Sequence, residues 1–253
     1  MKIRVRLQDS PSTPSRIETF DVALVEGASV HAALVAIGRR PITVEGRTVD
    51  PPAWDASCLE GSCGSCTVRL DGRAVLACRT AVAGDRPDRR GGALIEPLAR
   101  FPVVRDLVVD RARQGEALAR ADAHALPSDA PQGPGAAAAT GPEPPGHLAM
   151  RASLAACISC GACIEACPET GARSDFVGPE AIARNRLARL HPGADAAFED
   201  RLARGLMGPG GVAACGKAQA CVDVCPVDVP LLEAIADGAR DTSTRWLFSW
   251  MRR

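Results

Sequence analysis

The sequence predicts an α+β protein in which a small sheet with one packed helix, within residues 1–100, precedes a mostly helical part that begins at residue 148. Three observations lead to this expectation. Apolar and polar residues alternate in the first part, apolar residues recur at helical spacing in the last part, and cysteines gather in both parts but not between them.

Four short segments predict the sheet. Residues 1–8 alternate between charged and apolar side chains, and a second strand candidate, residues 17–24, follows after a turn-like stretch of Pro and Ser. Residues 67–70 and 74–77 flank the dipeptide Asp71-Gly72, which is a strong signal of a tight hairpin. We therefore expect these segments to form a small sheet.

Helix ends are marked by capping residues and prolines. Ser29 suits an N-cap, and apolar residues at helical spacing follow it up to Gly38, which stands where a C′ glycine would end the helix. In the last part of the chain, Pro179 and Pro230 suit the first turns of two helices, and residues 195–204 predict another helix with a glycine directly behind it.

Three parts are expected along the chain. Residues 1–121 form the first domain and the bridge that leads out of it, and residues 148–253 form the helical domain. Between them, residues 122–147 hold six prolines and four glycines, which is the composition of a connector or an irregular crossing segment.

Charge and hydropathy exclude several classes of function. The chain has 30 basic and 30 acidic residues, so nothing in its balance indicates a nucleic-acid partner. The N-terminus lacks the apolar core of a signal peptide, and no stretch approaches the roughly 18 apolar residues of a membrane span. We expect any membrane contact to come through a partner.

Eleven cysteines are the main anomaly of the composition. A disulfide framework is one interpretation, but the count is odd, the chain is long for a stapled domain, and no secretion signal is found. Cysteines that are bunched this tightly in an intracellular protein usually bind metal.

The first cysteine group has the spacing C-x4-C-x2-C, followed after 11 residues by a fourth cysteine at the end of the expected hairpin. Four thiolates on a loop and a nearby strand suit a [2Fe–2S] cluster, and the glycines between them allow the loop to wrap closely. A structural zinc ion is the alternative, although zinc sites usually come as two C-x2-C pairs. The proposed ligands are Cys58, Cys63, Cys66 and Cys78.

The second group has the spacing C-x2-C-x2-C-x3-C-P, and the third ends in C-x3-C-P. In two-cluster ferredoxins with this run, the fourth cysteine ligates the other cluster. The crossed pattern assigns a [4Fe–4S] cluster to Cys157, Cys160, Cys163 and Cys225. It assigns the remaining cluster to Cys167, Cys215 and Cys221.

The third group lacks one ligand, because Ala218 stands where the pattern requires cysteine. Three thiolates favour a [3Fe–4S] cluster, and a [4Fe–4S] cluster with one ligand other than cysteine is the alternative. The eleven cysteines are then used in sets of four, four and three. No thiol remains for nucleophilic catalysis, and no catalytic residue is expected in this chain.

These motifs resemble the iron–sulfur subunit of succinate dehydrogenase/fumarate reductase. The likeness includes residues 54–60 before and within the first cysteine loop, the bridge at 101–111, and the segments 176–179 and 240–242. The resemblance implies a β-grasp-like [2Fe–2S] ferredoxin domain followed by a mostly α-helical bis-cluster ferredoxin domain.

The resemblance also implies partners and a role. An FAD-binding flavoprotein subunit exchanges electrons with succinate or fumarate. This chain passes single electrons through the three clusters, and quinone reacts at a membrane cytochrome b or anchor subunit. The chain is then a peripheral protein on the cytoplasmic side of the cell membrane. The alternative is the electron-transfer subunit of a soluble flavoenzyme, such as a thiol-linked fumarate reductase or a heterodisulfide-reductase-like complex. A long cysteine-rich extension would favour that alternative.

The sequence differs from the ubiquinone-reducing members of the family in two places. Those members resemble one another in having Trp after the fourth Cys-Pro and His after the first cysteine of the third group. This chain has Glu169-Thr170-Gly171-Ala172 and Gly216 at those places. It is closer to members that serve menaquinone and a dihaem cytochrome b, so haem b is expected on the membrane partner.

Overall fold

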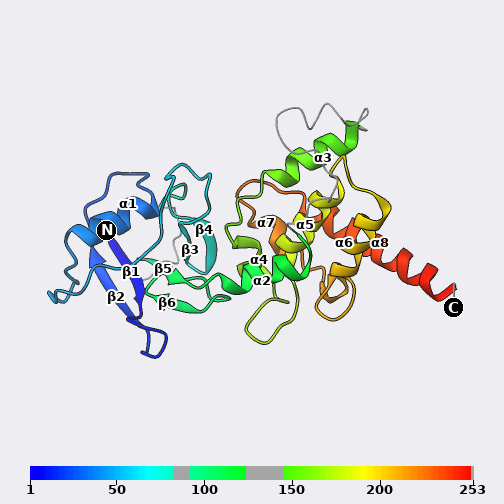
Figure 1. Cartoon of the computed structure of the whole chain (residues 1–253). Helices are drawn as coiled ribbons and strands as arrows, with labels where there is room; N and C mark the ends of the chain where they lie inside the picture. Colours follow the sequence, from blue (N-terminus) through cyan, green and yellow to red (C-terminus); the bar gives the residue numbers. More distant parts are fainter. Residues whose placement is uncertain (83–91, 124–144, 252–253) are drawn as a thin grey trace. The chain divides into compact units, whose positions relative to one another are not determined.

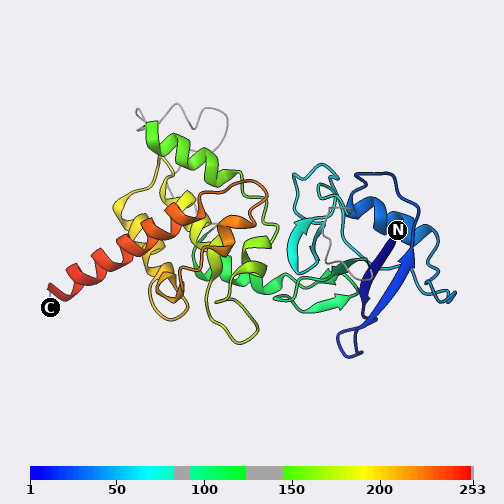
Figure 2. The same ribbon diagram turned by 180° about the vertical axis from the view of Figure 1, so that it is seen from behind.

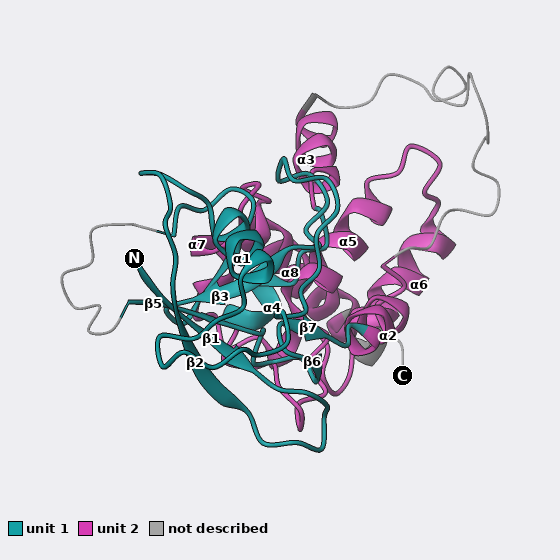
Figure 3. Ribbon diagram, turned by 90° about the vertical axis from the view of Figure 1, so that its left-hand side faces the viewer, with its two compact units in different colours: residues 1–111, 158–166 teal, residues 112–157, 167–253 magenta. Residues whose placement is uncertain are grey.

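The structure, a computed structural model, describes residues 1–82, 92–123 and 145–251 and divides into two compact units (Figure 1, Figure 3). The first unit contains residues 1–111 and 158–166, and the second contains 112–157 and 167–253. No helix within the described residues is both long and apolar enough to cross a membrane.

A five-stranded mixed sheet forms the centre of the first unit. The strand order is β2-β1-β5-β3-β4, in which only β1 and β5 run parallel. Apolar and charged residues alternate along β1, and this places Ile3, Val5 and Leu7, each at most 1% exposed, on one buried face. The strands are β1 (Lys2–Leu7), β2 (Arg16–Asp21), β3 (Thr67–Leu70), β4 (Arg73–Leu76) and β5 (Ala93–Glu96).

The second strand is shorter than the sequence predicts. It ends at Asp21, which pairs with Lys2 of β1, rather than at residue 24. The ammonium group of Met1 closes this end of the pair with a hydrogen bond of 3.0 Å to Asp21 Oδ1 and one of 2.8 Å to the Val22 carbonyl.

The hairpin between β3 and β4 forms as predicted. Asp71 and Gly72 have φ angles of 50° and 84°, and Leu70 pairs with Arg73 across the turn. Positive φ angles at both central residues are characteristic of the type I′ hairpin turn, in which Asp-Gly is a preferred dipeptide. Asp71 also accepts a hydrogen bond of 2.9 Å from the Leu94 N–H, which joins the turn to β5.

Helix α1 (Val30–Arg39) begins as predicted but ends later. The Ser29 hydroxyl caps it by accepting from the Ala32 N–H at 3.2 Å. Gly38 lies inside the helix, so the expectation that it is the C′ glycine is wrong. The helix ends at Arg39, because the next residue, Arg40, precedes Pro41, and a residue before proline avoids the helical conformation.

The bridge out of the sheet forms a second, two-stranded sheet of β6 (Val103–Arg105) and β7 (Val108–Val109). Asp106 in its turn accepts from the N–H groups of Gln8 and Ala53 at 3.0 and 2.9 Å. This buried carboxylate therefore ties the bridge to the residue that follows β1 and to the long loop between α1 and β3.

Helices make up the second unit. Figures 1 and 2 show α5 and α8 side by side at its centre, in agreement with their packing. The helices of this unit are α2 (Ala112–Arg120), α3 (Pro145–Ala155), α5 (Gly178–Arg189), α6 (Ala196–Leu206), the 3-10 turn η2 (Val212–Ala214), α7 (Ala220–Asp223) and α8 (Leu231–Met251). The short helix α4 (Ala162–Ala166) belongs to the first unit.

The predicted helix starts are found in the second unit, but one end differs. Pro179 lies in the first turn of α5, and the Asp195 carboxylate caps α6 by accepting from the Phe198 N–H at 2.7 Å. Helix α6 continues through Gly205 to Leu206. A β-carbon at Gly205 would stand 3.0 Å from the Ala121 carbonyl, so this glycine permits close packing rather than a helix end.

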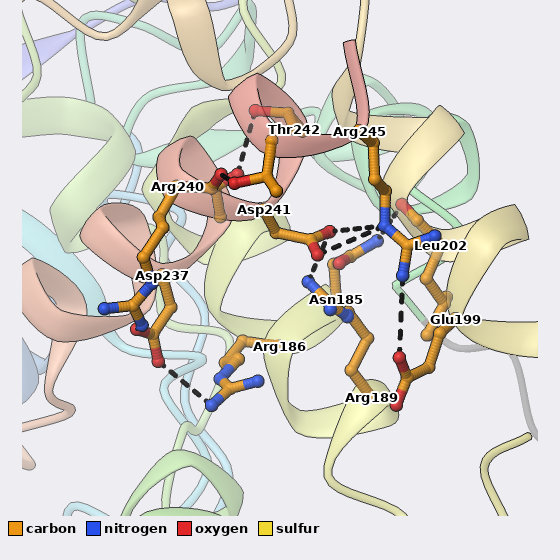
Figure 4. A network of polar contacts seen from close by, with 12 residues as sticks. Asn185, Arg186, Arg189, Glu199, Leu202, Asp237, Arg240, Asp241, Thr242 and Arg245 are labelled. Carbon is orange, nitrogen blue, oxygen red and sulfur yellow. Dashed lines mark hydrogen bonds and ion pairs between the residues drawn. The ribbon is translucent and has the colours of Figure 1, made fainter. Parts of the chain in front are cut away.

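A network of charged side chains joins α8 to α5 and α6 (Figure 4). Arg189 pairs with Asp241 at 2.8 Å, and Arg186 pairs with Asp237 at 3.0 Å. Arg245 also pairs with Asp241, and it reaches Glu199 on α6 at 3.5 Å. The network therefore holds three helices in register around the buried core.

The division into three parts stays a prediction. Most of the expected connector, residues 124–144, lies outside the described residues, and its end at 145–147 forms the start of α3. The compact units divide at residue 111 rather than 121, since α2 packs on α5. Gln114 on α2 donates a hydrogen bond of 2.6 Å to the buried Glu180 of α5.

Candidate iron–sulfur sites

The first cysteine loop is wrapped tightly around its own thiols. Leu59, Gly61 and Gly64 have φ angles of 61°, 83° and 71°, so the loop turns repeatedly through the left-handed region. The Ser62 N–H points at the Cys58 sulfur, at 3.3 Å. Main-chain donors that point at cluster sulfurs are one of the means by which a protein sets a cluster's potential.

The four thiols of this group lie close enough to change one another's acidity. Hydrogen bonds from the Ser62 side chain, the Glu60 main chain and Cys63 lower the pKa of Cys58 to about 6. Burial, together with the neighbouring thiols of Cys66 and Cys58, raises the pKa of Cys78 to about 11. The structure therefore brings together all four proposed ligands of the first cluster.

The hairpin positions the fourth thiol. The Ala77 N–H donates to the Cys66 carbonyl at 3.1 Å, so the residue before Cys78 is bonded to the last cysteine of the loop. The Thr67 hydroxyl donates to the Gly64 carbonyl at 2.7 Å and fixes the loop from the strand side. Cys66 and Cys78 thus stand at the two adjacent ends of β3 and β4.

The third cysteine group also comes together, within the second unit. Burial raises the pKa of Cys167, and the nearby thiol of Cys215 adds to this rise. Burial raises the pKa of Cys221 to about 11, with further contributions from Cys167 and Cys215. Three mutually interacting thiols in an apolar surrounding that includes Phe176 and Val212 form this site.

The segment between Cys215 and Cys221 has an unusual backbone. Lys217 and Gln219 have φ angles of 59° and 58°, which residues other than glycine adopt rarely. Ala218 lies between them and is exposed. The backbone therefore adopts the left-handed conformation on both sides of Ala218, the position at which the C-x2-C-x2-C pattern has its second cysteine.

A carboxylate stands beside this site that the sequence did not single out as functional. A β-carbon added to Gly216 would lie 2.3 Å from Glu169 Oε1, so the glutamate occupies the space next to this glycine. The Glu169 charge also raises the pKa of Cys167. The position of Glu169, two residues after the predicted ligand Cys167, was the signal that could have identified it.

The proposed ligands of the second cluster are divided between the two units. Cys160 and Cys163 lie in the segment 158–166 of the first unit, and Cys157 and Cys225 belong to the second unit. Each pair is held by its own unit. In the second unit, the Val229 N–H donates to the Cys225 sulfur at 3.3 Å, and Arg184 donates to the Cys157 carbonyl at 3.1 Å.

The thiol sets fit iron–sulfur clusters in their chemistry. Thiolates are the usual ligands of such clusters, and N–H groups already point at the sulfurs of Cys58 and Cys225. Within the described ranges, no three His, Cys, Asp or Glu side chains are arranged to hold one single metal ion. The first and third thiol groups each bring several sulfurs close enough to influence one another's pKa.

Comparisons with known proteins agree with this arrangement. Residues 2–116 match the family described as a 2Fe-2S iron-sulfur cluster binding domain, and residues 153–229 match the 4Fe-4S dicluster domain. The succinate dehydrogenase iron-sulfur subunit of Bacillus subtilis (strain 168) is 35% identical over 238 residues, which are 93% of this chain and 90% of that protein. The fumarate reductase iron-sulfur subunit of Haemophilus influenzae is 31% identical over 208 residues, 78% of this chain and 77% of that protein.

A solved structure has the same fold. The chain superposes on one chain of the Mycobacterium smegmatis Sdh1 complex in the apo form with a TM-score of 0.76, at 23% identity. The match covers 96% of this chain and 95% of that chain. Together with the two matched families, it confirms the predicted α+β order of a [2Fe–2S] domain followed by a helical cluster domain.

Proposed function

Because the chain belongs to the family of succinate dehydrogenase/fumarate reductase iron–sulfur subunits, we propose that it passes single electrons between an FAD-binding flavoprotein and membrane quinone. The observation that carries this proposal is the pair of matched cluster domains, whose cysteines supply eleven thiols in three groups. The clusters supply the one-electron chemistry when they are bound. The protein holds them, orients N–H donors toward their sulfurs and limits their contact with water.

The ligand assignment follows the cysteine spacing. Cys58, Cys63, Cys66 and Cys78 hold the [2Fe–2S] cluster. Cys157, Cys160, Cys163 and Cys225 hold the [4Fe–4S] cluster, by the crossed pattern of two-cluster ferredoxins. Cys167, Cys215 and Cys221 hold the third. The mutual effects among the four thiols of the first group, and among the three of the third, support those two sets.

The third cluster is [3Fe–4S] in this proposal. Three thiols surround the site, and Ala218 at the place of the missing cysteine has no side chain that could bind iron. Cys167 and Cys221 are each only 7% exposed, and this burial raises the pKa of both thiols, which supports a site with little water. A hydrophobic surrounding of this kind controls solvent access and so influences a cluster's potential.

The membrane end is proposed to serve menaquinone and a cytochrome b that carries haem. Glu169 and Gly216 stand at places where the ubiquinone-reducing members resemble one another in other residues. The contact between Glu169 and Gly216 supports the difference from the ubiquinone-reducing members, because a side chain at position 216 would have to displace the Glu169 carboxylate. The chain itself then works as a peripheral subunit at the cytoplasmic face of the cell membrane.

Isolation of the complex from membranes tests this function. An affinity tag on this chain should recover a flavoprotein with bound FAD and a haem-containing cytochrome b. Succinate added to the complex should reduce the clusters, as seen by EPR, and electrons should reach menaquinone. A preparation without flavoprotein, or clusters that stay oxidised with succinate and are reduced instead by a dithiol substrate, would contradict the proposal.

Haem analysis and a ubiquinone reductase assay of the purified complex test the menaquinone assignment separately from the electron-transfer role. If the complex lacks haem and reduces ubiquinone at a site that touches this chain, the menaquinone assignment is wrong. The role as an electron-transfer subunit would remain, because it depends on the clusters and the flavoprotein.

A further inference from the structure

The segment that carries Cys160 and Cys163 packs in the first unit, although residues 112–157 separate it from the end of that unit's main stretch at Arg111. It comprises residues 158–166 and includes helix α4. Figure 3 shows this stretch in the colour of the first unit, to which β3 also belongs. Something specific must hold it there, because five helical residues have little stability of their own.

Backbone contact with the first cysteine loop is one such feature. A β-carbon on Gly64 would lie 2.8 Å from both Cα and Cβ of Cys160, and 2.8 Å from the Ile158 carbonyl oxygen. Gly64 stands between Cys63 and Cys66 in sequence, so a loop that holds the first cluster touches a ligand of the second. Only glycine fits here, both for space and for its φ of 71°.

Glu165, near the end of the segment, provides a second anchor through polar contacts, which we call the clamp. Its Oε1 lies 3.4 Å from Arg69 Nε, and its Oε2 accepts from the Arg100 N–H at 2.9 Å. The Glu165 side chain is only 7% exposed and that of Arg69 is 24% exposed. Arg69 is on β3, which begins directly after Cys66, and Glu165 lies two residues beyond Cys163.

The clamp is part of a longer network in the same unit. Arg69 Nη2 lies 3.6 Å from Glu96, which in turn is bonded to Arg6 at 2.9 Å. Arg69 Nε has no hydrogen-bond partner, so ion pairing is what balances this buried nitrogen. Separately, Arg111 donates to the Cys160 carbonyl at 3.0 Å. The segment is thus anchored at the main chain of Cys160 and at Glu165, two residues after Cys163.

We propose that the Arg69–Glu165 ion pair is a positioning device for electron transfer. It holds Cys160 and Cys163 against the first cysteine loop, so that the Gly64–Cys160 contact becomes the path between the first and second clusters. This inference rests on the proposed function, because it assumes that both clusters are bound. Neither residue touches the clusters' iron; both act through the segment that they hold.

The test uses the full chain with its clusters reconstituted. The variants are Arg69→Gln and Glu165→Gln, with Arg69→Lys as the conservative replacement. Arg73→Gln is the matched control, because Arg73 is an exposed arginine on the neighbouring strand β4. Two quantities are measured: the magnetic interaction between the two reduced clusters in EPR, and the rate at which an electron passes from the first cluster to the second.

Arg69→Gln and Glu165→Gln should weaken the magnetic interaction and lower the transfer rate several-fold, with both cluster signals at full intensity. Arg69→Lys should restore most of the rate, and Arg73→Gln should match the wild type. A merely structural role would change the stability of the chain without this loss. Wild-type interaction and rate in both Gln variants would overturn the proposal.

A second measurement covers variants that fail to keep the second cluster. In the cluster-free chain, hydrogen exchange of the amides in 158–166 should be faster in Arg69→Gln than in the wild type, while exchange in α1 stays the same. Unchanged exchange in 158–166 would overturn the positioning role. A wild-type chain that takes up no clusters at all would instead contradict the proposed function, so the two failures are distinguishable.

Discussion

The carboxylate of Glu169 occupies the space beside Gly216, with Oε1 2.3 Å from the position of a β-carbon on that glycine. A negative charge therefore stands close to the site proposed for the third cluster, beside the residue that follows Cys215, and it also raises the pKa of Cys167. A nearby negative charge disfavours the addition of an electron to a cluster.

Replacement of this charge should raise the reduction potential of the third cluster. We expect Glu169→Gln to shift it upward by less than about 60 mV, which is a tenfold change for a one-electron couple. The shift is limited because Glu169 is exposed and water screens its charge. An EPR-monitored redox titration measures it, with Glu233→Gln, an exposed carboxylate on α8, as the control. A downward shift in Glu169→Gln would contradict the account.

Gly64 should be far more sensitive to substitution than another glycine of the same conformation. Gly72 has a φ of 84°, but a β-carbon there would meet nothing closer than Arg69 Nη2 at 3.9 Å. Both Gly→Ala changes cost about 1–2 kcal/mol through the left-handed backbone. Gly64→Ala must also displace the backbone of Cys160.

Chemical denaturation of the reconstituted chain compares the two alanine variants. Gly64→Ala should lose more stability than Gly72→Ala and should disturb the EPR signals of the first two clusters. Equal losses in the two variants would show that the contact between Gly64 and Cys160 has no energetic consequence.

The thiols of the cluster-free chain should differ in reactivity in a pH-dependent manner. Only the thiolate reacts with an alkylating reagent. With a pKa of about 6, Cys58 is mostly thiolate at pH 7 and becomes protonated below pH 6. With pKa values of about 11, Cys78 and Cys221 stay protonated from pH 7 to pH 9.

Timed alkylation with mass spectrometry checks this order. At pH 7 Cys58 should be labelled before Cys78 and Cys221, and its rate should fall when the pH is lowered to 5. Equal labelling rates at pH 7 would mean that the hydrogen bonds around Cys58 do not stabilise its thiolate.

Asp241 should be the most important carboxylate of the helical network in Figure 4. It pairs with Arg189, whose side chain is only 10% exposed, and with Arg245. Asp241→Asn leaves a largely buried guanidinium without its counter-charge and should cost about 2 kcal/mol of unfolding free energy. The control is Asp200→Asn, because Asp200 contacts the same Arg245 but is 52% exposed, and it should cost less than about 1 kcal/mol. Equal stability of the two variants in thermal unfolding would argue against the network.

Local patterns predicted the strands β1 to β4 and the starts of α1, α5, α6 and α8, because these features depend on neighbouring residues, but they did not predict β5 to β7. The Asp71-Gly72 turn and the caps at Ser29 and Asp195 are examples. The ends assigned to Gly38 and Gly205 were wrong for a different reason. A glycine after a helical pattern can mark a C′ position or allow a close approach, and at Gly205 the close approach depends on Ala121, which is distant in sequence.

The cysteine spacing predicted three thiol groups, but it could not predict how the segments that carry them pack. Residues 158–166 belong to the first unit because of long-range contacts such as Glu165 with Arg69. The Glu169 carboxylate beside Gly216 was missed for the same reason. Such pairings join residues far apart in the chain, and neither partner is marked by a periodic pattern.

Cys221→Ser separates the third cluster from the others. The variant should lose the signal that the oxidised protein is expected to show near g = 2, because one of only three thiol ligands is removed. The signal of the reduced first cluster should be unaffected, since its four thiols lie in the other unit. Retention of the oxidised signal would contradict the ligand assignment.

Iron analysis combined with EPR of the anaerobically reconstituted wild-type chain tests the central claim most directly. Clusters of two, four and three irons predict about nine iron atoms per chain, an oxidised [3Fe–4S] signal and a [2Fe–2S] signal that appears on reduction with dithionite. Bound zinc, or an iron content far below this value with neither signal, would contradict the account.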